Sequence, residues 1–399
     1  MKFSQASRLQ TLRTGVFHEI AIRQRIAEQK GLTIDLSKGS PDMGPPEVVL
    51  NALKAAVSDS RNYGYTLTGI EEFHEAVAYF YRQRYGVKLD PRTEVLQLIG
   101  SQDGLAHLPL SLMNPGDIAI LPDPGYPVYE AGIKLAGGIP YLMPLLKENS
   151  FYPDFDSIPT EIAHRAKLMY LNYPGNPVNV LADEAFFRKA VDFAKRYNIL
   201  LVHDFAYSEL VFDGKRSTSL LAIPGAKDVS VEFNSLSKTF NMAGCRIGYI
   251  VGNEHVLQAL ELLKSNIDFG VFLPIQKAAV AALTSDYSSI TETVKIYQER
   301  RDIFTSYLAQ GGWKVEKPSA TMFLWSKVPR GWTGRQFVFD VLEHTGVALT
   351  PGDAFGEMGK DYVRIALVQP IDRLIEAGER IQKFLSRFTG SPVETNVYI

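Results

Sequence analysis

The sequence predicts an α/β protein with two domains. The large one is a doubly wound, mostly parallel, seven-stranded sheet domain, and the smaller is an α+β domain formed by both chain ends. Through the middle of the chain, short β-prone runs alternate with longer helical patterns, as in doubly wound sheets. A chain of 399 residues is also too long for one ordinary core. The pattern changes near Asp286, so we expect a large domain over residues 46–285 and a small one over residues 1–45 and 286–399.

The predicted strands are seven short apolar runs: Val95–Ile99, Ile118–Leu121, Pro140–Met143, Leu168–Leu171, Leu200–His203, Val229–Phe233 and Arg246–Val251. Helical patterns fill much of the space between them, for instance at Glu71–Arg84, Glu184–Tyr197 and Val256–Lys264. Beyond Asp286 we expect a long charged helix through Arg301, then a meander, and a last helix near Ile371–Phe388.

Composition and charge exclude several classes of protein. Lys plus Arg number 42 against 44 acidic residues, so the net charge of −2 implies no nucleic-acid or membrane-surface partner. No apolar run has the length of a membrane span. The first thirty residues lack the apolar core of a secretory signal, and Glu19 and Glu28 favour a plain surface helix over a transit peptide.

A single cysteine, Cys245, excludes an intrachain disulfide and fits a reducing compartment, so we expect a cytoplasmic protein. Dinucleotide-binding, P-loop and zinc-protease motifs do not occur, and we expect no metal site.

The segment SLSKTFNMAGCRIGY, Ser235–Tyr249, carries the most chemical information. A lysine such as Lys238 can hold an aldehyde cofactor as a reversible Schiff base. Ser235, Ser237 and Arg246 are hydrogen-bond donors suited to a nearby phosphate. Together they describe a pyridoxal phosphate site. The alternative is a solvated Lys-Thr pair at the mouth of a helix, which is about as common when the segment is taken alone.

Two upstream segments supply the rest of such a site. An apolar strand ends in Asp204, whose carboxylate needs a cation there, and a pyridinium N–H is one. Tyr207 follows three residues later. The turn Pro174–Pro177 aims Asn176 toward the strand ends, where Asn176 and Tyr207 can share a phenolic oxygen. Singly, a turn asparagine and a half-buried tyrosine are more common, but four matches in this chain order make coincidence improbable.

These residues give the chain a family resemblance from about Leu36 to its last helix. It resembles the class I/II aminotransferases of the fold-type I pyridoxal phosphate enzymes. The passages IGSQDGLAHLPLSLMNPGD, PDPGYPVYEAG, SLSKTFNMAG and KSNID are closest in wording to bacterial LL-diaminopimelate aminotransferases and near relatives, including methionine-salvage transaminases. The resemblance implies pyridoxal 5'-phosphate as the cofactor, an L-amino acid and a 2-oxo acid as substrates, and a homodimer with a shared active site.

Further cofactor residues are expected in segments that precede these motifs in the chain. A helix predicted over Leu105–Met113, opened by the Gly-Ser turn of GSQDG, offers free backbone N–H groups to a phosphate. Ser101 and Gln102 are therefore assigned to the phosphate, with helix capping by Ser101 as the alternative. The resemblance implies that Tyr126 stacks on the cofactor ring, whereas composition alone favours a packing tyrosine. It also implies that Tyr65, in YGYTLTG, reaches the neighbouring subunit's phosphate. The alternative is a loop tyrosine within its own subunit.

The substrate-binding residues are expected at both ends of the substrate. Arg364 lies in an apolar strand-like run, where the resemblance makes it the clamp of the substrate α-carboxylate and a structural salt bridge is the alternative. In relatives the main chain at the position of Gly39 approaches the same carboxylate. In KSNID, Asn266 and Asp268 are candidates for binding the far end of a long polar substrate. Alternatively, Asn266 caps a helix and the pocket accepts several neutral amino acids.

Three positions depart from the family pattern. Cys245 stands where relatives usually carry a bulky aromatic residue, Asn179 replaces a common glycine, and Lys38 replaces a glycine in the carboxylate loop. None removes a catalytic group, but Lys38 is placed to alter side-chain preference. Cys245 is expected to be a small buried spacer rather than a nucleophile.

The function that follows is a pyridoxal phosphate-dependent aminotransferase, with Lys238, Asp204 and Tyr207 as its catalytic residues and LL-diaminopimelate with 2-oxoglutarate as its first-choice substrates. The alternatives are an aminotransferase for aspartate, alanine or a methionine-salvage substrate, or a fold-type I carbon–sulfur lyase. A non-catalytic regulatory module would carry a DNA-binding extension, for which Met1–Leu36 is too short, and would not need Lys238.

Overall fold

The structure is a computed structural model that describes residues 3–10, 12, 19, 22, 23, 25 and 33–387. The described residues form two compact units, the first within Met1–Arg13, Ser40–Val294 and Ser319–Thr321 and the second within Thr14–Gly39, Lys295–Pro318 and Met322–Ile399. The domain limits drawn from the sequence stay a prediction. The expected N-terminal surface helix lies mostly outside the described residues, which show only α1 (Ser7–Gln10) there.

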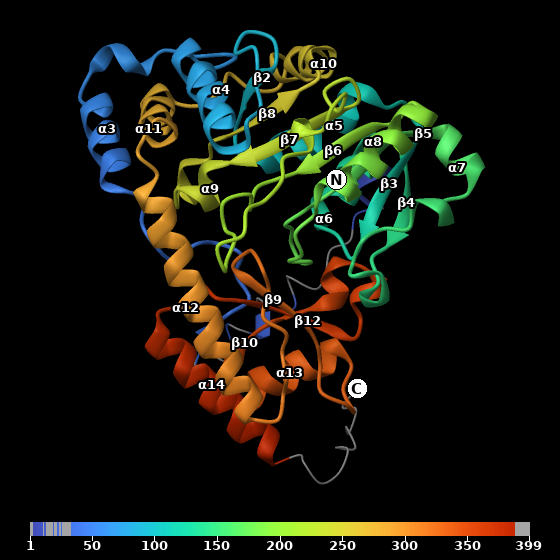
Figure 1. Ribbon diagram of the computed structural model, residues 1–399, viewed down its shortest axis with the longest axis vertical. Coiled ribbons are helices and arrows are strands. Elements are labelled where there is room, and N and C mark those ends of the chain that lie inside the picture. Colours follow the sequence, from blue (N-terminus) through green and yellow to red (C-terminus); the bar gives the residue numbers. More distant parts are fainter. Residues whose placement is uncertain are drawn as a thin grey trace. The chain divides into compact units, whose positions relative to one another are not determined.

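The first unit contains the predicted seven-stranded sheet, in the order β2-β8-β7-β6-β5-β3-β4 (Figure 1). Its strands are β2 (Val95–Leu98), β3 (Ile118–Asp123), β4 (Ile139–Pro144), β5 (Ala166–Leu171), β6 (Leu200–Asp204), β7 (Ser230–Ser235) and β8 (Gly248–Gly252). The pairs from β4 through to β7 are parallel, whereas β8 is antiparallel to both β7 and β2. Six strands therefore share one direction, and the prediction of a mostly parallel α/β sheet is confirmed.

Helices cover both faces of this sheet. The helices of the first unit after α1 are α3 (Glu47–Val57), α4 (Glu71–Tyr85), α5 (Ser101–Leu112), α6 (Pro127–Leu135), α7 (Thr160–Arg165), α8 (Glu184–Tyr197), α9 (Leu236–Thr239), α10 (Glu254–Lys264) and α11 (Leu273–Leu283). On β5, Met169 packs into a core cluster with α8, while its neighbour Tyr170 packs into another cluster with α5, α6 and α10. Successive strand residues point to opposite faces, so the apolar run of β5 is buried on both sides, whereas only Met143 is buried in the edge strand β4.

The second unit has a two-stranded parallel sheet and a three-stranded antiparallel one. In the first, β1 (Ile34–Asp35) pairs with β10 (Val347–Ala348). In the second, β12 (Tyr362–Ala366) lies between β11 (Thr350–Pro351) and β9 (Phe323–Lys327). Helices α13 (Gly334–Thr345) and α14 (Ile371–Ser386) belong to this unit, and the long helix before them is α12 (Ser288–Gln310).

Most predicted helices and strands are found within a few residues of their expected bounds, and three differences concern one helix start, one strand start and one helix that was not predicted. Helix α5 begins at Ser101, although the sequence predicted a start at Leu105. The sequence predicts a strand from Arg246, but the φ of Arg246 is 52°, in the left-handed region, and the strand starts only at Gly248. Helix α13 was missed inside the expected meander. None of the helices in the described part of the chain has the length and apolar character needed to cross a bilayer.

Candidate active site

Most of the predicted site residues of the first unit lie at one edge of its sheet. Because six strands share a direction, the carboxyl ends of β2, β3, β5, β6 and β7 meet at this edge, together with the amino end of the reversed strand β8. The residues at these strand ends are Ser101 and Gln102 after β2, Tyr126 after β3, Asn176 after β5, Asp204 and Tyr207 at β6, Ser235, Ser237 and Lys238 at β7, and Arg246 before β8. Ligands of open α/β sheets bind at this kind of edge.

Asp204 is a buried carboxyl at the end of β6. The Tyr129 hydroxyl donates to its Oδ2 at 2.7 Å, and the Ala206 N–H donates to its Oδ1 at 3.3 Å. Burial raises the pKa of Asp204 above its ordinary value, although these hydrogen bonds act to lower it. Burial likewise raises the pKa of Tyr129, so its hydroxyl remains a donor. The site therefore holds a carboxyl whose charge a cation would stabilise.

Asn172 joins the end of β6 to the turn that carries Asn176. Its Nδ2 donates to the Asp204 carbonyl at 2.6 Å, and its Oδ1 accepts from the Asn176 N–H at 2.8 Å. Both asparagines are buried. A Cβ on Gly175 would lie 2.3 Å from the Asn172 carbonyl oxygen, so only glycine allows this close turn. The turn predicted from Pro174–Pro177 thus places Asn176 beside Asp204.

Lys238 lies on the short helix α9, directly after β7. The Ser235 side chain accepts from the Ser237 N–H at 3.1 Å and caps this helix, and the two hydroxyl groups are 2.9 Å apart. Both serines are buried and Lys238 is half-buried. Burial raises the pKa of Asp204, and the positive charge of Lys238 acts in the opposite direction.

The start of α5 and the guanidinium of Arg246 come together at the end of β2. Gly100 precedes the helix with a φ of +79°, and a Cβ there would lie 2.7 Å from Arg246 Nη2. Arg246 is exposed and also donates to the Ala243 carbonyl at 3.0 Å. Since Gly100 has no side chain, capping does not occupy the first turn of α5, and Ser101 is already helical. This arrangement offers an arginine and backbone N–H groups to an anion.

Tyr126 and Gln102 are also brought together. The Tyr126 hydroxyl donates to Gln102 Oε1 at 2.9 Å, and Tyr126 lies at the start of α6. Tyr207 is buried in the turn that follows β6. All the predicted residues from the strand ends of the first unit are therefore at the same sheet edge.

Arg364 and Gly39 lie in the second unit. The Arg364 side chain is buried, its guanidinium carbon lies 4.4 Å from the centre of the Phe323 ring, and its Nη2 donates to the Ser37 carbonyl at 2.5 Å. A Cβ on Gly39 would lie 3.9 Å from Arg364 Nη1. Arg364, the predicted clamp of the substrate carboxylate, and Gly39 are thus neighbours within this unit.

The three departures from the family pattern are placed without disturbing these contacts. Lys38 is exposed, and its Nζ lies 2.8 Å from Asp35 Oδ2. Burial acts to raise the pKa of Asp35, but hydrogen bonds from Lys38 and Ser37 outweigh it and lower that pKa. Cys245 is half-buried, and burial raises the pKa of its thiol, which disfavours the nucleophilic thiolate. Asn179 is half-buried.

Tyr65 and Asn266 lie on exposed parts of the first unit. The Tyr65 side chain is 85% exposed and its ring lies 5.0 Å from that of Phe269. Asn266 is exposed and donates to the Leu262 carbonyl at 2.9 Å, at the end of α10. The carboxylate of Asp268 is held 2.8 Å from the buried ammonium of Lys264.

Sequence reasoning missed Tyr129 and Asn172, which both contact Asp204. Tyr129 lies three residues after Tyr126, on the first turn of α6, and Asn172 is the first residue after β5. Both residues could have been predicted from their positions. A polar side chain directly after a buried strand, or at the start of the helix that follows one, lies at the sheet edge that carries the site. The distance from Tyr129 to Asp204 along the chain hid the contact.

A family model described as aminotransferase class I and II matches residues 33–380. The chain belongs to this family. It is an enzyme, a transaminase, and the predicted fold-type I architecture is confirmed.

The relatives of this aminotransferase cover nearly all of it. It is 46% identical over 385 residues to the LL-diaminopimelate aminotransferase of Moorella thermoacetica, covering 96% of this chain and 99% of that protein. It is 43% identical over 382 residues to the protein of that name from Aquifex aeolicus, with 95% and 99% coverage. Among solved structures, substrate-bound BacF from Bacillus subtilis superposes with a TM-score of 0.93 at 40% identity, covering 96% of this chain and 98% of BacF.

Proposed function

We propose that this aminotransferase moves the amino group of LL-diaminopimelate to 2-oxoglutarate, with pyridoxal 5'-phosphate as its cofactor. The observation that carries the substrate proposal is the near full-length identity to LL-diaminopimelate aminotransferases of several bacteria, 46% in Moorella thermoacetica and 44% in Desulforudis audaxviator. The segment Lys264–Asp268 contains no arginine, which disfavours a strict preference for the short dicarboxylate aspartate.

The residues at the sheet edge fit this cofactor. The buried carboxyl of Asp204 suits the protonated ring nitrogen, because burial without a cation raises its pKa. Gly100 leaves room for Arg246 beside the first turn of α5, an arrangement suited to the phosphate. When bound, the cofactor supplies an aldehyde for an amine and a ring that accepts the electrons released at the substrate Cα.

Each residue then has a role at a defined atom. Lys238 Nζ would hold the cofactor and would take the proton from the substrate Cα. The Asp204 carboxylate would keep the ring nitrogen protonated, Asn176 and Tyr207 would bind the phenolic oxygen, and Tyr126 would stack on the ring. Ser101, Gln102, Ser235, Ser237 and Arg246 bind the phosphate. Arg364, with the main chain at Gly39, binds the substrate α-carboxylate.

Borohydride reduction tests the cofactor assignment. Reduction of the purified protein should fix the cofactor to Lys238, as read by peptide mapping. The Lys238→Ala variant should keep the cofactor non-covalently and lose transamination. Labelling of another lysine would refute the assignment.

A comparison of kcat/KM for LL-diaminopimelate, glutamate, aspartate, alanine and methionine tests the substrate. We expect the highest value for LL-diaminopimelate. If a small neutral amino acid equals it, the substrate proposal is wrong while the aminotransferase assignment stands. Half-reaction spectroscopy separates the carbon–sulfur lyase alternative, because only a transaminase leaves the cofactor in its amine form.

We further propose a cytoplasmic homodimer in which Tyr65 binds the phosphate, and Asn266 the far end of the substrate, in the neighbouring subunit. The support is an exposed apolar patch formed by Tyr63, Tyr65, Phe269 and Phe272, which we call the aromatic patch. Large exposed patches of this kind mark interaction sites. A second copy of the chain would cover the patch and bring Tyr65 to a site.

A further inference from the structure

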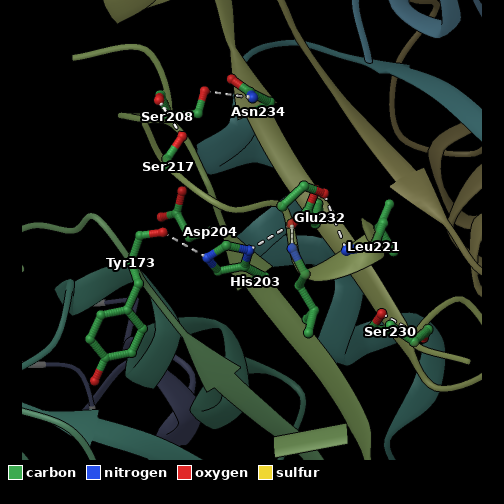
Figure 2. Close-up of polar contacts among 12 residues, drawn as sticks. Tyr173, His203, Asp204, Ser208, Ser217, Leu221, Ser230, Glu232 and Asn234 are labelled. Carbon is green, nitrogen blue, oxygen red and sulfur yellow. Dashed lines mark hydrogen bonds and ion pairs between the residues drawn. The ribbon is translucent and has the colours of Figure 1, made fainter. Parts of the chain in front are cut away.

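A buried histidine and glutamate lie directly beside Asp204. His203 on β6 and Glu232 on β7 are register partners, and both side chains are 0% exposed. His203 Nδ1 lies 2.8 Å from Glu232 Oε1, and His203 Nε2 lies 3.0 Å from the Tyr173 carbonyl oxygen. Figure 2 shows the imidazole between these two acceptors. Phe187 and Phe205 pack on the same ring, with centroids at 5.1 and 4.8 Å.

The hydrogen-bond inventory determines how many protons this pair holds. A carbonyl oxygen only accepts, so His203 Nε2 carries a proton. A neutral imidazole has one N–H, so Nδ1 would then be an acceptor facing a carboxylate oxygen. Glu232 already accepts from the Ser219 hydroxyl at 2.7 Å and from the Leu220 N–H at 2.6 Å. A second proton must therefore lie between Nδ1 and Oε1, which leaves the pair neutral as a whole and all its polar atoms satisfied.

Two connections join the His203–Glu232 pair to the proposed active site, one through the turn that carries Asn176 and one along β6 to Asp204. Tyr173, whose carbonyl accepts from His203, begins the turn that carries Asn176 and follows Asn172, the residue that joins Asp204 to Asn176. His203 also precedes Asp204 on the strand. Successive strand side chains point to opposite faces, so the His203 side chain lies on the face of the sheet opposite to that of Asp204.

We infer that His203 is a positioning residue for the aminotransferase site: with both ring nitrogens protonated by its pairing with Glu232, it fixes the Asn176 turn to the strand end that carries Asp204. The inference rests on the cofactor roles proposed for Asn176 and Asp204. A histidine that merely fills the core would need one ring proton and would act on stability alone.

The substitution Glu232→Gln separates these two roles, because it hardly changes size. A glutamine oxygen at the Oε1 position can accept from Leu220 and from His203 Nδ1, but the imidazole then either stays charged without a counter-ion or gives up its Nε2 proton. Giving up that proton breaks the bond to Tyr173. If instead the amide nitrogen takes this position, it opposes the Leu220 N–H. Each arrangement loses a contact that the carboxylate allows.

The first measurement is proton NMR of protein labelled with ¹⁵N-histidine, with His203→Gln used to assign the signals. We expect two downfield ring protons for His203 in the parent and one in Glu232→Gln. Ser219→Ala is the matched control: it removes a donor to Glu232 without touching His203, so both ring protons should remain. A single downfield ring proton in the parent would overturn the inference, whatever the enzyme's substrate.

The second measurement is a double-mutant cycle on kcat/KM. Glu232→Gln should lower kcat/KM about tenfold, as expected for one lost buried hydrogen bond. Combined with Asn176→Ala it should lower kcat/KM by less than the product of the single effects, because both act on one turn. Ser219→Ala should combine multiplicatively with Asn176→Ala. Multiplicative combination for Glu232→Gln as well would also overturn the inference. Failure of the proposed function, by contrast, would appear as an inactive parent with both ring protons intact.

Discussion

Asp204 is the buried carboxyl on which the proposed cofactor site depends. Burial raises its pKa, so the folded protein favours the neutral acid, and its favourable contribution to stability is present at low pH and lost as pH rises through the raised pKa. We therefore expect Asp204→Asn to increase the Tm of the cofactor-free protein at pH 8, with a gain that shrinks toward pH 4. Thermal unfolding of both proteins across this range measures it.

The same substitution should have the opposite effect on the loaded enzyme. Without a carboxylate to keep the ring nitrogen protonated, kcat should fall by about 100-fold or more. If the variant is less stable than the parent at pH 8 in the cofactor-free state, Asp204 is not a buried carboxyl that needs the cofactor's cation as its partner.

Gly39 is a position where function rather than folding requires glycine. A Cβ there would lie 3.4 Å from Phe323 Cζ and 3.9 Å from Arg364 Nη1, which is ordinary contact. Gly39→Ala should therefore change the free energy of unfolding by less than about 1 kcal/mol but raise KM for the amino acid about tenfold by crowding its carboxylate. Gly44→Ala, where a Cβ meets nothing within 4 Å, is the control. Equal KM values for the two variants would exclude Gly39 from the carboxylate site.

Individual residues were predictable from the sequence where burying a charged side chain without a partner would cost free energy. A carboxylate at the end of an apolar strand, as at Asp204, and a lysine among serines, as at Lys238, need partners and so attract attention. Tyr129 gives no such signal, because a tyrosine on a helix can pack in the core without a charged partner. Its role depends on a contact with a residue 75 positions away, which only the fold defines.

Among the elements, the loop that carries Tyr65 depends on a buried glutamine of α11. Gln276 accepts from the Ile70 N–H at 2.9 Å and donates to Thr66 Oγ1 and to the Val271 carbonyl, both at 2.7 Å. It thereby holds the residues that follow Tyr65 against the segment that leads into α11.

We expect Gln276→Leu to lower the free energy of unfolding by about 1–3 kcal/mol, because the Ile70 N–H loses its acceptor. It should also expose the Tyr65 loop to proteolysis under native conditions. Limited proteolysis with mass spectrometry locates the cleavage. Gln258→Leu, on the exposed side of α10, is the control. Cleavage elsewhere, or at the same rate in both variants, would show that Gln276 does not hold the loop.

The strands of the seven-stranded sheet other than β4 were predictable because they are buried on both faces and read as continuous apolar runs, whereas only Met143 is buried in the edge strand β4. Their neighbours were harder to delimit. Residues 100–104 look like a loop because two glycines and a serine favour turns, yet the helix α5 includes the second glycine, Gly104, which packs against Phe233 and Leu98. Arg246 could not be recognised as left-handed from its type, and α13 was hidden among residues whose strands are only two to five residues long.

For the whole molecule, the aromatic patch predicts an assembly with shared sites. If Tyr65 acts in the neighbouring subunit, a hybrid of Tyr65→Phe and Lys238→Ala subunits contains one site free of both changes. Mixing the two impaired parents should then restore transamination in proportion to the hybrid formed. Activity that stays at the parental level in verified heterodimers would mean that Tyr65 serves its own subunit.

The strand order also has a consequence for the order of events during synthesis. At the edge of the sheet, β2 has β8 as its neighbour, and Val95 pairs with Val251. A growing chain therefore cannot seat β2, or the turn at Gly100 behind it, until residue 252 has left the ribosome. Contacts this distant in sequence form late, because a long loop must close first. The residues of β2 and of the Gly100 turn are made early, and they stay without their final partners until residues about 150 positions later have been made.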